Sequence, residues 1–205
     1  MKLFYSPNAC SMGIHLLLEE IGEPFQLEKV VFASGAQYQA PFIAINPKSK
    51  VPLLQRDDGS YLSEFPAIAF YLARAKPEAG LLPAGLEAEV RALELLDYLI
   101  ATVHMRGFTR IFRPALFAPG AADEEWVKQA GRDVIVKGFD LLAPVLGEQD
   151  YILGAFSIVD AALFFLEYWA RTRAKIALPQ NFEAHLDRLL ARPATMRMLK
   201  AEGLA

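Results

Sequence analysis

Apolar residues in the first 76 positions form short runs separated by helix-length segments. Residues 2–5 and 25–31 are typical of strands, and between them residues 12–21 carry apolar side chains at helical spacing. Residues 51–62 predict a hairpin, because two apolar runs flank an Asp-Asp-Gly turn. A helix is predicted over residues 63–74, with a looser segment and a short helix before the hairpin. The predicted order is βαβαββα, a mixed sheet with helices packed on it.

Proline and glycine punctuate residues 77–86 and predict a linker there. Beyond the linker, apolar residues recur at helical spacing as far as the last residues of the sequence. The predicted helices span residues 87–113, 124–146, 157–171, 182–190 and 195–202. The sequence therefore predicts an α+β protein, with an α/β domain over 1–76, a linker over 77–86 and an all-helical domain over 87–205.

Composition narrows the class of protein without naming a function. Hydrophobic residues make up 54% of the 205 positions and the formal net charge is −3, which predicts a globular chain with no nucleic-acid partner. The most apolar stretch, residues 151–170, contains Ser157, Asp160 and Glu167, so no membrane span is expected. The opening apolar run is too brief for a signal peptide, and a cytoplasmic location is expected.

Cys10 is the single cysteine, so an intrachain disulfide and a cysteine-rich zinc site are both excluded. It follows a strand and a proline turn and stands where a helix begins, a position at which backbone N–H groups lower a thiol pKa. Position alone fits either a reactive thiol or a small buried hydrophobe. His104, between Val103 and Met105, is likewise open to a structural or a catalytic interpretation.

Five segments, in order, match one family. Residues 1–11, 44–54, 62–72, 156–163 and, near the close, 191–193 together with 201–204 resemble the corresponding segments of cytosolic glutathione transferases, and of the bacterial beta class in particular. The resemblance implies a thioredoxin-like βαβαββα domain followed by an all-α domain. It also implies glutathione as co-substrate, no metal, and a homodimer that acts in detoxification.

The resemblance also implies a role for individual residues. The sulfur chemistry is assigned to Cys10, with His104 facing it and with Tyr5 and Ser11 as hydrogen-bonding candidates that otherwise fit a strand-core aromatic and a helix cap. The glutathione-binding positions are Lys50, Val51, Pro52, Glu64, Phe65 and Asp97, with a cis peptide bond expected between Val51 and Pro52. The hydrophobic co-substrate positions are Phe108, Phe112 and Trp169.

Three departures from the beta-class pattern affect the ends of glutathione. No lysine occurs in residues 34–37, which leaves Lys50 as a candidate for the missing charge. Phe65-Pro66 follows Glu64, and Asp97 replaces an asparagine. The expected function is a transferase that conjugates or thiol-exchanges glutathione with small hydrophobic electrophiles. The alternatives are a catalytically weak binding or regulatory protein on the same fold, and a glutathione-dependent thiol oxidoreductase.

Overall fold

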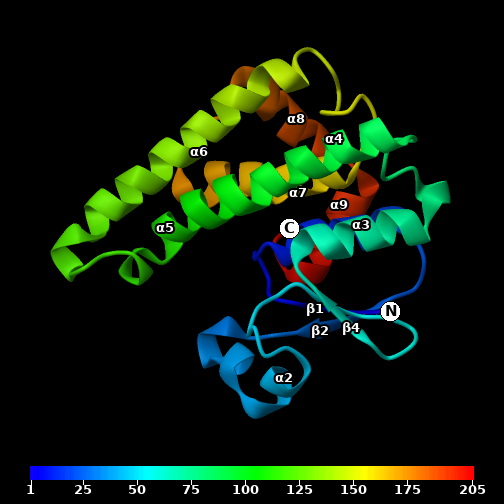
Figure 1. Ribbon diagram of the computed structural model, residues 1–205, viewed down its shortest axis with the longest axis horizontal. Coiled ribbons are helices and arrows are strands. Elements are labelled where there is room, and N and C mark those ends of the chain that lie inside the picture. Colours follow the sequence, from blue (N-terminus) through cyan, green and yellow to red (C-terminus); the bar gives the residue numbers. More distant parts are fainter. The chain divides into compact units, whose positions relative to one another are not determined.

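The computed structural model describes residues 1–205, which form two compact units (Figure 1). The first unit comprises Met1–Leu82 and Leu190–Ala205, and the second is Pro83–Leu189. The boundary at Leu82 lies inside the segment predicted as a linker. The sequence-based division assigned residues 190–205 to the helical domain, whereas the structure groups them with the sheet.

The first unit contains a four-stranded mixed sheet. Its strands are β1 (Lys2–Tyr5), β2 (Gln26–Lys29), β3 (Leu53–Gln55) and β4 (Tyr61–Ser63), in the spatial order β2-β1-β3-β4. β1 pairs with β2 in parallel, whereas β1–β3 and β3–β4 are antiparallel. The predicted βαβαββα order and the hairpin are confirmed.

Helices cover both faces of this sheet. On one face, α1 (Ser11–Ile21) and α3 (Phe65–Ala75) pack against each other and against β1 and β4. On the other face, α2 (Ala40–Ile45) supplies Phe42, whose ring lies edge-on to Phe4 with 6.1 Å between centroids. Alternate residues of β1 therefore serve two separate apolar layers. Short 3-10 turns complete the unit: η1 (Phe32–Ser34), η2 (Ala36–Tyr38) and η3 (Pro77–Ala79).

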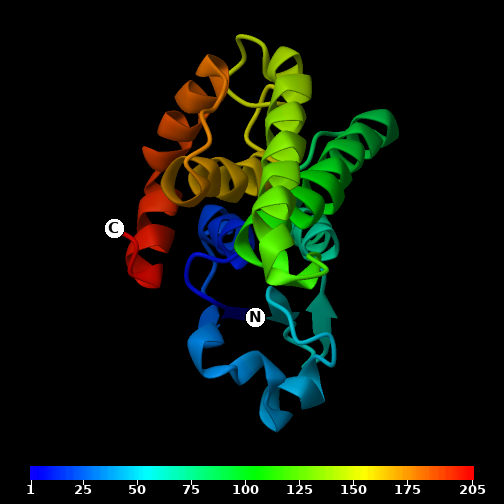
Figure 2. The same cartoon turned by 90° about the vertical axis from the view of Figure 1, so that its left-hand side faces the viewer.

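The last helix, α9 (Pro193–Glu202), packs beside α1 in this unit, as the red and blue helices of Figure 2 show. Arg192 donates two hydrogen bonds to the carboxylate of Glu20, at 2.6 and 2.8 Å. Arg197 donates one hydrogen bond to the carboxylate of Glu19 at 2.6 Å and one to its backbone carbonyl at 2.8 Å. Charge pairing as well as apolar contact therefore holds α9 against α1.

The second unit is entirely helical. Its elements are α4 (Leu86–Asp97), η4 (Tyr98–Phe108), α5 (Thr109–Phe112), η5 (Pro114–Leu116), η6 (Ala121–Asp123), α6 (Glu124–Leu146), α7 (Ile158–Trp169), η7 (Ala170–Ala174) and α8 (Gln180–Leu190). α4, η4 and α5 follow one another without a break, so the long helix predicted over 87–113 is present. No helix in the chain combines the length and the apolar character that a bilayer crossing requires.

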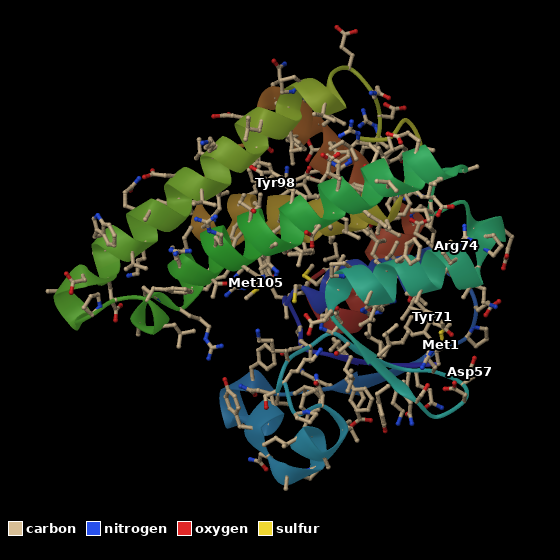
Figure 3. All side chains as sticks on the ribbon, viewed as in Figure 1. Met1, Asp57, Tyr71, Arg74, Tyr98 and Met105 are labelled. Carbon is tan, nitrogen blue, oxygen red and sulfur yellow. The ribbon has the colours of Figure 1, made fainter.

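The middle of that long helix is wound more widely than an α-helix. Over η4 the turns are π-helical, and the N–H of Thr109 donates to the carbonyl of His104, five residues earlier. η4 packs closely on α6 because two glycines meet there. A Cβ on Gly131 would lie 2.8 Å from the carbonyl oxygen of Gly107, closer than packed atoms approach. Figure 3 marks the course of this helix by Tyr98 and Met105.

A buried charged triad links α7 to α8. Asp160 accepts hydrogen bonds from the backbone N–H and the hydroxyl of Ser157, and the two residues form a capping box at the start of α7. His185 contacts Asp160 at 3.1 Å through Nε2 and Glu167 at 2.8 Å through Nδ1. Burial opposes the imidazolium, but these two carboxylates outweigh it and raise the pKa of His185 to about 9.

Candidate active site

Cys10 lies where the β1–α1 loop enters α1. It is the residue that precedes the first turn, and its thiol donates to the carbonyl oxygen of Val51 at 3.4 Å. The Val51–Pro52 peptide bond is cis, as the resemblance predicted. Cys10 therefore meets the backbone of Val51, one of the positions that the resemblance assigned to glutathione binding.

Cys10 is partly buried, and the pKa of its thiol is raised. Burial raises its pKa to about 12, which outweighs the N–H groups of Cys10 and Ser11 and the positive charge of Lys50 that lower it. The expectation of a lowered pKa at the helix start was wrong. The hydrogen bonds and the charge expected to favour a thiolate are present, but the cost of burying the charge exceeds their effect.

Ser11 and Tyr5 have structural contacts. The Ser11 hydroxyl is fully buried, donates to the carbonyl of Ser6 at 3.2 Å and accepts from its N–H at 3.3 Å, so it closes the loop that carries Cys10. Tyr5 is buried in β1 with its ring 5.8 Å from that of His15. Burial, together with the negative charge of Glu202, raises the pKa of Tyr5. A role for either hydroxyl at the sulfur of a ligand stays a prediction.

Three non-glycine residues around Cys10 adopt left-handed backbone conformations. Asn8 (φ 57°) comes two residues before Cys10, Ser49 (φ 55°) two residues before Val51, and Glu64 (φ 73°) directly before α3. They are the only non-glycine residues of the first unit with positive φ. Such conformations concentrate at binding and catalytic sites, because the surrounding contacts must compensate for their cost.

The loop before Val51 brings cationic side chains to this region. Asn46 closes the loop by donating from its amide to the carbonyl of Lys50 at 2.8 Å. The Lys50 side chain is exposed, and its charge acts on Cys10. Lys48 binds the Glu64 carboxylate at 2.8 Å and the Ser63 hydroxyl at 2.9 Å. Glu64, one of the predicted glutathione-binding positions, therefore has a lysine ammonium as its partner in this structure.

Phe65 and Pro66 open α3. Phe65 is 4% exposed, so its side chain belongs to the core and only its backbone is available to a ligand. Pro66 occupies the first turn, as predicted.

The remaining predicted residues belong to the second unit. His104 lies on η4 with its ring 5.4 Å from both Phe165 and Trp169. Phe108 and Phe112 pack on Trp169 at 5.5 and 5.4 Å. The three predicted co-substrate residues thus form one aromatic cluster, and His104 is part of it. Its pairing with Cys10 stays a prediction.

Sequence reasoning missed Arg173, which stacks on this aromatic cluster. Its guanidinium lies 4.0 Å from the ring centroid of Phe112 and 5.7 Å from that of Trp169. This is a cation–π geometry. The available signal was its spacing of four residues after Trp169, which places both on one helix face.

Asp97 is exposed at the end of α4. Leu86 and Val90, which precede it on the helix, are 79% and 49% exposed. Spacings of four and seven residues put the three on one face, so Asp97 ends an exposed stripe whose apolar members are Leu86 and Val90 and which also carries the exposed Glu94.

Comparison with known proteins places the chain in a family. The family model described as "Glutathione S-transferase, N-terminal domain" matches residues 8–75. Glutathione S-transferase GstA of Escherichia coli O157:H7 is 35% identical over 208 residues, which span all of both chains. The chain belongs to the glutathione S-transferase family. Glutathione S-transferase GST-4.5 of Xanthomonas campestris is a further relative, 29% identical over the full length of both proteins.

Solved structures of glutathione transferases share the fold. A ternary complex of BphK, a bacterial GST, is 35% identical, covers both chains completely and gives a TM-score of 0.88. A beta-class glutathione S-transferase of Sphingomonas chungbukensis is 34% identical with complete coverage and a TM-score of 0.82. The predicted glutathione-transferase fold is therefore confirmed.

Proposed function

We propose that this family member is a beta-type glutathione transferase that joins reduced glutathione to small hydrophobic electrophiles. The observation that carries the proposal is the hydrogen bond from the Cys10 thiol to the Val51 carbonyl, beside the cis-proline. A sphingomonad relative of 34% identity has been solved as a complex with glutathione, which supports the same ligand here.

The Val51 backbone would hold the cysteinyl part of glutathione as an added strand. The ligand N–H then takes the carbonyl of Val51, to which Cys10 now donates. Once displaced, the Cys10 S–H donates to the sulfur of glutathione. A thiol that stays protonated stabilises a neighbouring thiolate by a charge-assisted hydrogen bond. Cys10 would in this way favour ionisation of glutathione, and the ligand thiolate attacks the electrophile.

The ends of glutathione would be held by charge. Lys50 supplies a cation for a ligand carboxylate, and the strained turn at Glu64 and Phe65 offers backbone groups at the start of α3. The carboxylate of Glu64 would exchange its bond with Lys48 for one with the ligand ammonium. In a homodimer, Asp97 would reach the ammonium end of the glutathione that is bound by the partner subunit.

His104 and the aromatic cluster would serve the electrophile. The cluster of Phe108, Phe112 and Trp169 provides the apolar surface, with His104 as a proton acceptor at its edge. The π-helical winding of η4 supports a functional role for His104, because such segments occur frequently at functional sites.

Conjugation is favoured over thiol exchange as the main reaction. A mixed disulfide requires Cys10 to ionise, and burial raises its pKa to about 12. A protonated thiol is a poor nucleophile but a competent hydrogen-bond donor. The cytosol, which keeps thiols reduced, is the compartment that suits this chemistry.

The proposal is tested with glutathione and an aryl chloride that carries two nitro groups. Cys10→Ala is expected to lower kcat/KM for conjugation by about tenfold, since one charge-assisted hydrogen bond to the thiolate is lost. Cys10→Ser, which keeps an O–H donor, should retain more of the activity. Equal activity of wild type and Cys10→Ala would contradict the role of Cys10. Absence of conjugation by the wild type would favour the binding-protein alternative.

A further inference from the structure

Beyond the residues expected to touch glutathione, one carboxylate holds the loop that carries Cys10. Glu202, on α9, is 6% exposed. Its Oε2 accepts the backbone N–H of Asn8 at 3.0 Å, and its Oε1 contacts Nδ1 of His15 at 2.9 Å. The bond to Asn8 joins residues 194 positions apart in the sequence. Glu202 therefore links the final helix, helix α1 and the loop before Cys10.

Asn8 is the strained member of that loop. Its φ of 57° lies in the left-handed region, which costs free energy for residues other than glycine, although asparagine enters it more readily than most. The carboxylate offers the Asn8 N–H a charged acceptor only while the loop keeps this conformation. Two residues later, Cys10 reaches the carbonyl of Val51. A change in the backbone at Asn8 would move Cys10 away from that contact.

His15 fixes the carboxylate in turn. Its imidazole is fully buried in α1, between the rings of Tyr5 at 5.8 Å and Phe25 at 5.7 Å. Nε2 lies 3.9 Å from Glu19, while Nδ1 meets Glu202. The carboxylate is therefore aimed at Asn8 by a ring that the core holds in place.

We propose that Glu202 is a positioning residue for Cys10: it holds Asn8 in its left-handed conformation and so keeps the thiol against the backbone of Val51. Only the expected effect of Glu202 on turnover rests on the proposed function of Cys10. Its effect on the thiol itself needs no ligand and can be measured independently.

Alkylation of Cys10 by iodoacetamide is the direct test, because the reaction reports access and ionisation without glutathione. In Glu202→Ala we expect the loop to relax and the partly buried thiol to become more accessible to water, so that the burial that raises its pKa is reduced. Alkylation at pH 8 should become about tenfold faster or more, and the pH profile should move toward that of an ordinary thiol. Lys50 and Glu64, the charged groups that act on the thiol, stay in place. Conjugation should slow by about fivefold, since the donor is misplaced.

Two variants separate positioning from stability. Glu202→Gln can still accept the Asn8 N–H and donate to His15, so its alkylation rate should match wild type. Glu20→Ala removes the two bonds to Arg192 and loosens α9 on α1 without touching Asn8. Its alkylation rate, measured well below its own melting temperature, should also match wild type.

A second substitution, at Asn8 itself, tests whether the backbone conformation of the loop is what Glu202 controls. Glycine adopts positive φ without strain, so Asn8→Gly in the Glu202→Ala background should return alkylation toward the wild-type rate. The proposal would be overturned if Glu202→Ala were alkylated at the wild-type rate, or if Glu20→Ala were accelerated as much as Glu202→Ala. If conjugation proved independent of Cys10, the proposed function would fail, while the alkylation rates would still decide the role of Glu202.

Discussion

At the scale of single residues, the site combines a protonated thiol with nearby charges that do not ionise it. Lys50 lowers the pKa of Cys10, Glu64 raises it, and burial exceeds both. We therefore expect the partly buried thiol to ionise less readily in the free protein than an ordinary thiol does. We expect iodoacetamide to alkylate native wild-type protein at pH 8 about 100-fold more slowly than the urea-unfolded chain, because an ordinary thiol has a pKa near 8.5. Similar rates in the two states would show that burial does not protect the thiol.

Lys50 provides a second residue-scale prediction. Its exposed ammonium is the candidate for a ligand carboxylate, in place of a lysine that residues 34–37 lack. Lys50→Gln should raise the KM for glutathione by about fivefold, because one charge-assisted contact with the ligand is lost. The kcat should stay within about twofold of the wild-type value. Lys2→Gln, which removes an equal charge from β1, is the control and should leave KM unchanged. An unaltered KM in Lys50→Gln would assign the carboxylate to another group.

At the scale of elements, local sequence signals were sufficient for most helices and strands. Residues 2–5 were predicted as a strand and form β1, and residues 12–21, predicted as helical, lie within α1, which Gly22 ends with φ 75°. The π-helical turns of η4 were missed because no proline or other local signal marks them. The contacts of Glu202 with Asn8 and of His185 with two carboxylates were also missed. Such pairs form only when the chain folds and leave no spacing signal.

The packing of η4 on α6 leads to a prediction about stability. Alanine at Gly131 would put a methyl group 2.8 Å from the backbone oxygen of Gly107, so the helices must separate. Gly131→Ala should reduce the free energy of unfolding by about 1–3 kcal/mol, measured by urea denaturation. Gly120→Ala is the control, because its Cβ would lie 3.6 Å from its nearest neighbour and its φ is −152°. Equal stability of the two variants would contradict close packing at this crossing.

At the scale of the whole molecule, the buried triad makes stability depend on pH. The folded-state pKa of His185, about 9, exceeds its unfolded value near 6.5, so its contribution is complete below pH 6.5 and is lost as the pH rises to 9. The free energy of unfolding, measured by urea denaturation, should fall by about 3 kcal/mol between pH 6.5 and pH 9. NMR titration of the His185 ring assigns the effect to this residue. A flat stability profile over this range would show that the imidazole is not charged in the folded protein.

The exposed apolar residues of α4 bear on how the protein assembles. Leu86 and Val90 are exposed on one face, and Met105, farther along the same helix and labelled in Figure 3, is 38% exposed. We expect a homodimer that covers this stripe, with twice the 22.7 kDa mass of one chain in sedimentation. Val90→Asp should shift the mass toward the monomer, because a charge would be buried without a partner. Val136→Asp, a matched change at a 44% exposed valine on α6, should leave the dimer intact.

If the monomeric Val90→Asp variant also shows a raised KM for glutathione, Asp97 contributes across the interface. An unchanged KM in that monomer would restrict Asp97 to the surface of its own subunit.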